Sequence, residues 1–262
     1  MNESIPLAAT VLVLRDRGDG IEVLMITRHA EAVFAGGALV FPGGRLDPGD
    51  AGAALLARCR AVPGEGIPEL ALRVCAIRET FEEARLLLAR PAGAADLVSG
   101  AALAAIEEQL RAKYGRAPDF AELVIEGGLE LATDLLVPFA HWITPKPRPR
   151  RFDTYFYLAP APEAQEALHD GAEAVDSIWV EPARAAADGT AKRVKMIFAT
   201  RFNLLKLARS RSREIAFAAA RADPIVAVCP EHRDTPEGAM WCIPIEAGYG
   251  VAQIPVANEV TA

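Results

Sequence analysis

Three glutamates at helical spacing constrain this chain more than any other feature of its sequence. Glu79, Glu82 and Glu83 stand at positions i, i+3 and i+4 within the segment Arg78 to Leu86. At 3.6 residues per turn, these three side chains share one face of a helix. Like charges on one helix face repel each other by a few tenths of a kcal/mol per pair. A divalent cation such as Mg²⁺ removes that penalty, because it prefers carboxylate oxygens as ligands.

The same glutamates could instead form an ordinary solvated helix face. Arg78 with Glu82, or Glu82 with Arg85, would then be surface ion pairs of small energetic value. Two observations favour the metal site. The opposite side of the segment carries an apolar stripe, formed by Leu72, Cys75, Ala76, Leu86 and Leu87. The earlier sequence Phe41-Pro42-Gly43-Gly44 supplies a glycine pair, which lets backbone approach a ligand closely.

Composition excludes several classes of protein. The 262 residues are 52% apolar and 24% charged, as in a globular domain, and the net charge of −7 argues against a nucleic-acid partner. The cysteines form no C-x-x-C pair, which favours free thiols in a reducing cytoplasm. No stretch reaches 18 uncharged apolar residues and the start lacks a basic leader, so we expect a cytoplasmic protein with no membrane association.

The order of patterns predicts a single α/β domain over residues 1–262. Apolar, β-branched runs predict strands at 8–14, 21–27, 39–41, 152–158, 177–180, 225–228 and 240–243, with the last two completing a sheet. Amphipathic spacing predicts helices at 69–90, 97–114, 120–126, after Pro182, and at 192–209. The long acidic helix is expected to end only at Pro91. Residues of about 51–68 and 95–130 are expected to be helical insertions.

A basic run interrupts this acidic sequence. Lys146, Arg148, Arg150 and Arg151 alternate with prolines and precede the aromatic strand beginning at Phe152. An exposed Pro-rich connector would explain the pattern. We favour an anion-binding rim for a phosphorylated substrate, with Arg28 as a further phosphate contact from the end of the second strand.

The glutamate segment resembles the Nudix box, which reads Gly, five residues, Glu, seven residues, then Arg-Glu-U-X-Glu-Glu-X-Gly-U, where U is apolar. The matching positions are Gly44, Arg78, Glu79, Glu82, Glu83 and Leu86. Asp50 stands in place of the first Glu, Thr80 in place of an apolar residue, and Arg85 in place of the later Gly. Residues 51–77, 27 in all, replace the seven-residue spacer, so an insertion splits the box.

The remaining sequence resembles one branch of the Nudix superfamily, the long proteins related to the peroxisomal and mitochondrial coenzyme A and acyl-CoA diphosphatases. The split box and the sequence Arg151-Phe152-Asp153-Thr154 carry this resemblance. It implies an α/β/α sandwich around a mixed sheet. It also implies a hydrolase that cleaves a small-molecule diphosphate, with CoA or acyl-CoA as the favoured substrate. ADP-ribose or another nucleotide sugar is the competing substrate, and a non-catalytic Nudix-fold nucleotide-binding module is the alternative of another class.

The resemblance also assigns roles to individual residues. Mg²⁺ or Mn²⁺ would be held by Glu79, Glu82, Glu83 and the Gly44 carbonyl, with Asp50 adding a contact through water. Glu82, Glu83 and Arg78 would be the catalytic residues, with Arg78 orienting the carboxylates. Arg28, Arg151 and Asp153 would bind the substrate. Because Arg85 replaces the glycine of the box, we expect the helix to continue past this position.

Overall fold

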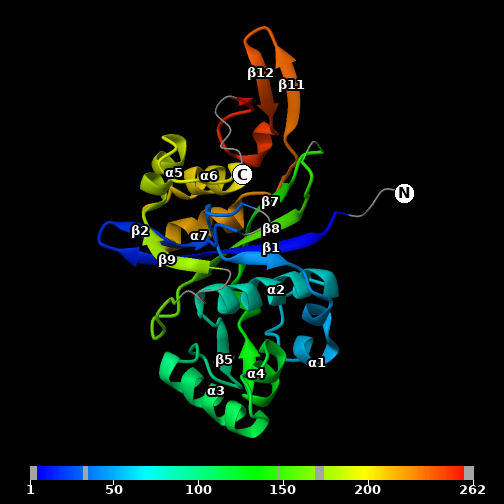
Figure 1. Cartoon of the computed structure of the whole chain (residues 1–262), viewed down its shortest axis with the longest axis vertical. Helices are drawn as coiled ribbons and strands as arrows, with labels where there is room; N and C mark the ends of the chain where they lie inside the picture. The colour runs from blue at the N-terminus through cyan, green and yellow to red at the C-terminus, as the bar shows by residue number, and fades with distance from the viewer. Residues whose placement is uncertain (1–4, 32–34, 147, 169–173, 257–262) are drawn as a thin grey trace.

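A mixed sheet forms the centre of the computed structural model, which describes residues 5–31, 35–146, 148–168 and 174–256 (Figure 1). Its strands follow the order β10-β7-β8-β1-β2-β3, with β4 paired to β1 and β9 paired to β2. β1 and β8 run parallel, whereas the pairs β1–β2 and β7–β8 are antiparallel. The strands of this sheet are β1 (Leu7–Arg17), β2 (Gly20–Arg28), β3 (Leu39–Val40), β4 (Gly43–Arg45), β7 (Val137–Ile143), β8 (Asp153–Pro160), β9 (Ala174–Val180) and β10 (Ala227–Val228).

The strand alternation builds one hydrophobic core on each face of the sheet. In β1, Val11 and Val13 enter one core while Leu12 and Leu14 enter the other, because successive side chains point to opposite faces. The first core packs under α2 (Ile67–Ala84). The second packs under α5 (Pro182–Thr190), α6 (Phe198–Leu207) and α7 (Arg213–Ala222). The predicted α/β/α arrangement around a mixed sheet is therefore confirmed (Figure 1).

The acidic helix ends earlier than the sequence predicted. α2 stops at Ala84, and Arg85 takes a left-handed conformation with φ of 58°. Its backbone N–H donates to the Phe81 carbonyl at 2.9 Å, which caps the helix. The expectation of a helix continuing to Pro91 is wrong, because Arg85 adopts the backbone conformation that the glycine of the box would provide. Residues Ala89–Pro91 form strand β5 instead.

The expected insertions form a compact unit below α2 (Figure 1). Residues 51–68 contain only the four-residue helix α1 (Ala53–Leu56) before α2 begins. Residues 95–130 contain α3 (Gly100–Tyr114) and α4 (Phe120–Glu126), close to the predicted helices. The sequence analysis missed the pairing of β5 with β6 (Leu129–Leu131). Leu103, Leu123 and Leu131 of this unit belong to the same core as α2.

The C-terminal region differs from the prediction in three ways. The helix expected at 192–209 begins only at Phe198, and Lys192 has a left-handed φ of 56°. The sequence analysis did not predict α7. The strand expected at 240–243 does not join the main sheet. It is β12 (Gly238–Cys242) of a separate sheet with β11 (Glu231–Thr235) and β13 (Gln253–Pro255), which projects from the body in Figure 1.

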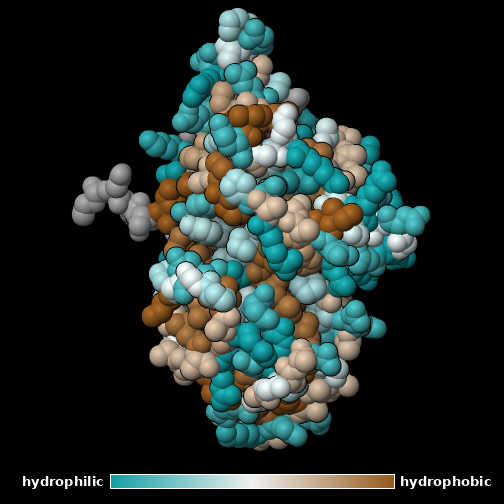
Figure 2. Space-filling model, turned by 180° about the vertical axis from the view of Figure 1, so that it is seen from behind, coloured by the Kyte–Doolittle hydropathy of each residue, from teal (hydrophilic) through white to brown (hydrophobic). Residues whose placement is uncertain are grey.

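Hydrophilic and hydrophobic residues are interspersed on the face seen in Figure 2, and its apolar patches are separated by polar ones. Among the helices of the described ranges, none is long and apolar enough to cross a membrane. The cysteines are free thiols. The cytoplasmic location stays a prediction.

Candidate active site

A buried arginine fixes α2 against the sheet. Arg73 is 2% exposed, and its Nε lies 2.6 Å from the Glu65 carboxylate. Its Nη1 donates to the carbonyl of Thr133 at 3.1 Å, just before β7. Charge-assisted hydrogen bonds of this kind are roughly twice as strong as neutral ones. This anchor sets the rotation of the helix, so that the face carrying the three glutamates meets β4.

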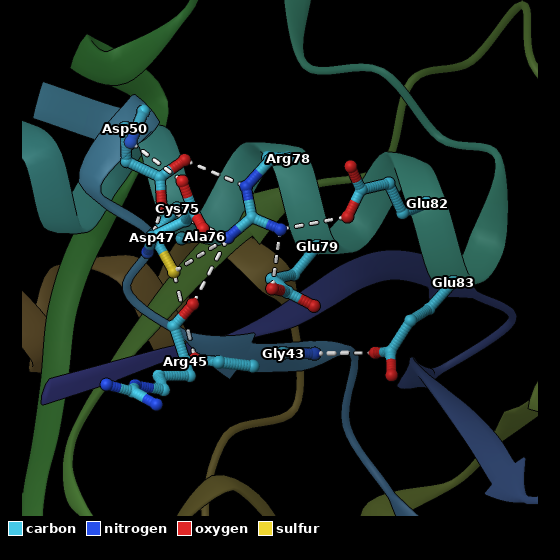
Figure 3. A network of polar contacts seen from close by, with 12 residues as sticks. Gly43, Arg45, Asp47, Asp50, Cys75, Ala76, Arg78, Glu79, Glu82 and Glu83 are labelled. Carbon is cyan, nitrogen blue, oxygen red and sulfur yellow. Dashed lines mark hydrogen bonds and ion pairs between the residues drawn. The ribbon is translucent and has the colours of Figure 1, made fainter. Parts of the chain in front are cut away.

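The glycine pair of β4 is required by close approaches on two sides, of helix α2 at Gly44 and of strand β1 at Gly43. A Cβ on Gly44 would lie 2.4 Å from the Glu79 carboxyl carbon, and one on Gly43 would lie 2.5 Å from the Ala9 carbonyl oxygen. The Gly43 N–H donates to Glu83 Oε2 at 2.8 Å, shown at the right of Figure 3. Glu83 is 3% exposed and also lies 3.4 Å from Arg28 Nη1. The strand backbone and one arginine thus hold the most buried of the three glutamates.

Arg78 connects the other acidic residues of the site (Figure 3). Its Nε and Nη2 contact the two carboxylate oxygens of Asp50 at 2.8 and 3.0 Å. Its Nη1 contacts Glu79 at 2.7 Å and Glu82 at 2.8 Å. Burial would lower the pKa of the Arg78 guanidinium. The hydrogen bonds to Asp50 and the charges of Glu79 and Asp50 outweigh that effect and raise the pKa, so Arg78 stays charged.

Asp50 is held by donors of the protein itself. It lies in a 3₁₀ turn, η1 (Pro48–Ala51), is 1% exposed, and accepts a further hydrogen bond from the Asp47 N–H at 2.9 Å. Both carboxylate oxygens are thus engaged by protein donors. The expected contact to a metal through water is not supported by this placement. Asp50 instead positions Arg78, and through it Glu79 and Glu82.

The predicted metal ligands fit a hard divalent cation in kind, because they are carboxylates and a backbone carbonyl. Glu79, Glu82, Glu83 and Gly44 all line one cavity. Among the described residues, however, no three acidic, histidine or cysteine side chains are already grouped as a metal would require. In Figure 3, Arg78 is bonded to both Glu79 and Glu82, while Glu83 is bonded to Gly43 of β4. A bound cation would have to compete with the Arg78 guanidinium for the oxygens of Glu79 and Glu82.

The cavity has a volume of about 960 Å³ and walls of three kinds. One wall carries the three glutamates of α2. A second set is cationic and consists of Arg28, Arg45, Arg78, Arg148 and Arg150. The third is aromatic and consists of Phe41, Trp142, Phe152, Phe156, Phe198 and Trp241. Such a volume is at the upper end for small-molecule sites and exceeds the needs of a bare diphosphate.

The structure brings only part of the predicted substrate-binding set to this cavity. Arg28 lines it, and the Arg28 Nε is buried without a hydrogen-bond partner. Arg151 does not line it, because its Nε donates to the Thr144 carbonyl at 2.8 Å. Asp153 lies 2.5 Å from His141 Nε2, also away from the cavity wall. From the same basic run, Arg148 and Arg150 reach the cavity instead.

The sequence analysis missed the aromatic wall. Phe198 begins α6, and Trp241 lies on β12, so their sequence distance from the glutamates gives no local signal. Trp142 lies on β7, a strand that the sequence analysis did not predict, and its neighbours come from the C-terminal third of the chain. Its ring lies 5.8 Å from that of Phe198 and 5.2 Å from that of Tyr249.

Comparison with known proteins gives consistent matches over most of the chain. The sequence model of the NUDT19 Nudix domain matches residues 53–209, more than half of the chain. The "Acyl-coenzyme A diphosphatase NUDT19" of Gallus gallus is 32% identical over 52% of this chain and 47% of its own length. The Homo sapiens protein of the same name is 30% identical over 64% of this chain and 55% of its own. The chain spans about half the length of these curated relatives.

A solved structure gives the corresponding match in three dimensions. A NUDIX hydrolase from Alicyclobacillus acidocaldarius is 29% identical, with a TM-score of 0.67. The match covers 83% of this chain and 97% of that protein.

Proposed function

The chain belongs to the NUDT19 Nudix domain family, and from this we propose that it hydrolyses the diphosphate of CoA or an acyl-CoA. The products would be adenosine 3′,5′-bisphosphate and 4′-phosphopantetheine or its acylated form. One observation carries the proposal. A single cavity places the carboxylates of Glu79, Glu82 and Glu83 together with arginines from three other segments of the chain. Relatives that share the family are named acyl-coenzyme A diphosphatases.

The carboxylate wall would hold Mg²⁺ or Mn²⁺ through Glu79, Glu82, Glu83 and the Gly44 carbonyl. Such an ion neutralises diphosphate oxygens and lowers the pKa of a bound water. Glu83 is held in place by the Gly43 N–H, and Arg78 keeps Glu79 and Glu82 oriented. Glu82 is 47% exposed, against 3% for Glu83, and is therefore the carboxylate better placed to accept a proton from the attacking water.

The arginines would bind the phosphates. Arg28 offers a buried Nε donor without a partner beside Glu83, where the scissile diphosphate would lie. Arg148 and Arg150 line the same cavity at the β7–β8 connection and would bind the 3′-phosphate. Guanidinium groups suit this role because they donate two parallel hydrogen bonds to one phosphate. This assignment replaces Arg151, whose Nε is already bound to a carbonyl.

The decisive experiment is a hydrolysis assay with Mg²⁺ or Mn²⁺ on CoA, acyl-CoA and ADP-ribose, with products identified by mass. We expect adenosine 3′,5′-bisphosphate from CoA and loss of activity in excess chelator. Turnover of ADP-ribose without turnover of CoA would overturn the assignment of CoA as the substrate. The assignment of the protein as a diphosphatase would stand. Tight nucleotide binding without hydrolysis of any of these compounds would favour the non-catalytic module.

A further inference from the structure

A trough crosses the sheet between the glutamate wall and the aromatic wall of the cavity. Trp142 of β7 pairs with Thr154 of β8, Thr154 with Ala8 of β1, and Ala8 with Arg45 of β4. These three steps between neighbouring strands span about 14 Å, at roughly 4.8 Å per step. Ala8 and Thr154 both line the cavity and have small side chains, so the floor between the two ends is open. The span is comparable to the extended length of a nucleoside monophosphate.

The aromatic end of this trough presents ring surfaces whose positions are fixed by packing. Trp142 donates its Nε1–H to the Tyr249 hydroxyl at 2.8 Å, and that hydroxyl donates to Asn203 Oδ1 at 2.7 Å. The Nε1–H group of Trp142 is therefore already hydrogen-bonded within the protein. Phe198 is half-buried and packs edge-on against Trp142, with an interplanar angle of 75°. Trp241 reaches the same cavity from β12.

The segment that contributes Trp241 belongs to a sheet separate from the main sheet, against which the glutamate-bearing helix α2 packs. β12 pairs only with β11 and β13 among the described strands, in the unit that projects beyond β7 in Figure 1. This unit also lies outside residues 53–209, which match the Nudix domain. Pro230, just before β11, lines the cavity beside it. The C-terminal unit thus supplies Pro230 and Trp241 to the cavity that the three glutamates line.

We propose that this aromatic end is a binding site for the adenine ring, formed by Phe198 and Trp241 with Trp142 behind them. The proposal rests on the proposed function, which supplies an adenine nucleotide as the substrate. Arg148 and Arg150 lie at the same end, since residues 144–152 directly join β7 to β8. These arginines can pair with the 3′-phosphate, which lies on the ribose beside the base. They cannot pair with an acyl chain, because it carries no charge. The nucleotide half of the substrate therefore lies along β1 and β8, and the acyl-pantetheine half leaves on the opposite side.

The test measures binding of adenosine 3′,5′-bisphosphate to the full chain in chelator, by calorimetry, without turnover. Phe198→Leu keeps apolar volume but removes the ring face. We expect the dissociation constant to rise roughly 5- to 150-fold, the range for losing one stacking contact with a base. Binding of 4′-phosphopantetheine should not change. Phe202→Leu is the matched control, because Phe202 packs against Phe198 one turn along α6 but does not line the cavity.

Trp241→Leu is the second variant, on a different element, in case Phe198→Leu does not fold. The proposal predicts weaker binding of the bisphosphate in this variant too. Unchanged bisphosphate affinity in folded Phe198→Leu and Trp241→Leu would overturn the adenine site. A KM that instead rises with acyl-chain length in these variants would also overturn it. The proposed function would survive either result, because CoA hydrolysis by the unmodified protein tests it separately.

Discussion

At the scale of single residues, the site depends on how Arg78 divides its hydrogen bonds. Asp50 is one methylene shorter than the glutamate of the usual box, yet both of its oxygens contact the guanidinium. The 3₁₀ turn that carries Asp50 brings its backbone close enough to compensate for the shorter side chain. Because Asp50 anchors one edge of Arg78, Nη1 remains for Glu79 and Glu82. Asp50 therefore holds the Arg78 side chain in place although it is shorter than the usual glutamate.

Neutralising a single carboxylate of the glutamate wall should abolish catalysis without unfolding the protein. We expect Glu82→Gln and Glu83→Gln each to lower kcat by orders of magnitude, because each removes a proposed ligand of the divalent cation. In the second variant, the side-chain amide oxygen can still accept the Gly43 N–H. The melting temperature should change by less than about 4 °C, as for a loss of about 1 kcal/mol. Glu108→Gln, on the exposed face of α3, is the control; full activity of either site variant would refute the assignment.

The basic run offers a test of phosphate recognition at the residue scale. Arg150→Ala should raise KM for CoA much more than for dephospho-CoA, which lacks the 3′-phosphate. Losing one charge-assisted contact costs about 1.5–3 kcal/mol, which is on the order of tenfold or more in affinity. Arg111→Ala, an exposed arginine on α3, should leave both KM values unchanged. An equal rise in KM for the two substrates would show that Arg150 does not bind the 3′-phosphate.

At the scale of elements, the end of α2 shows why one helix boundary was mispredicted. Arg85 has a left-handed backbone that costs an L-residue about 1–2 kcal/mol. Its side chain recovers part of this cost: the guanidinium lies 4.3 Å from the Phe81 ring and 2.6 Å from Glu107 of α3. These contacts link α2 to the helical unit below it. The sequence showed an arginine where a glycine was expected, but not the contacts that offset its strain.

The two substitutions Arg85→Gly and Arg85→Ala separate this strain from the lost contacts. Both remove the contacts with Phe81 and Glu107, but only glycine relieves the left-handed backbone. We therefore expect Arg85→Gly to be more stable than Arg85→Ala by about 1 kcal/mol in urea unfolding. A helix running through this position would give the opposite sign, because glycine in a helix interior is about 1 kcal/mol worse than alanine.

At the scale of the whole molecule, the two cores share one sheet. The helical unit below α2 has no separate core, since Leu103, Leu123 and Leu131 join residues of β1 and α2 in one cluster. The second cluster uses the alternate residues of the same strands and connects them to α5, α6 and α7. Tyr249, close to the C-terminal sheet, belongs to this second cluster as well. The main sheet therefore links the helical unit on one side to the C-terminal helices on the other through shared packing.

This arrangement predicts one cooperative unfolding transition for residues 1–262. Differential scanning calorimetry should give a single peak, with equal calorimetric and van't Hoff enthalpies. Near-UV and far-UV circular dichroism should lose signal at the same temperature. A separate early transition, with α3 and α4 lost first, would show instead that the insertion unfolds as a domain of its own.

The sequence by itself determined the alternation of the main strands, the face that Glu79, Glu82 and Glu83 share, and the α/β/α layering implied by the resemblance. The first two features depend on spacing within one element, which the chain order preserves, whereas the layering followed from the family resemblance. Only the tertiary structure decided which arginines reach the cavity. Arg151 and Arg150 are adjacent in sequence, but Arg151 turns to the Thr144 carbonyl while Arg150 lines the cavity. It also decided the aromatic wall, because Trp142, Phe198 and Trp241 meet through sheet pairing and core packing between distant segments, and no local pattern records such contacts.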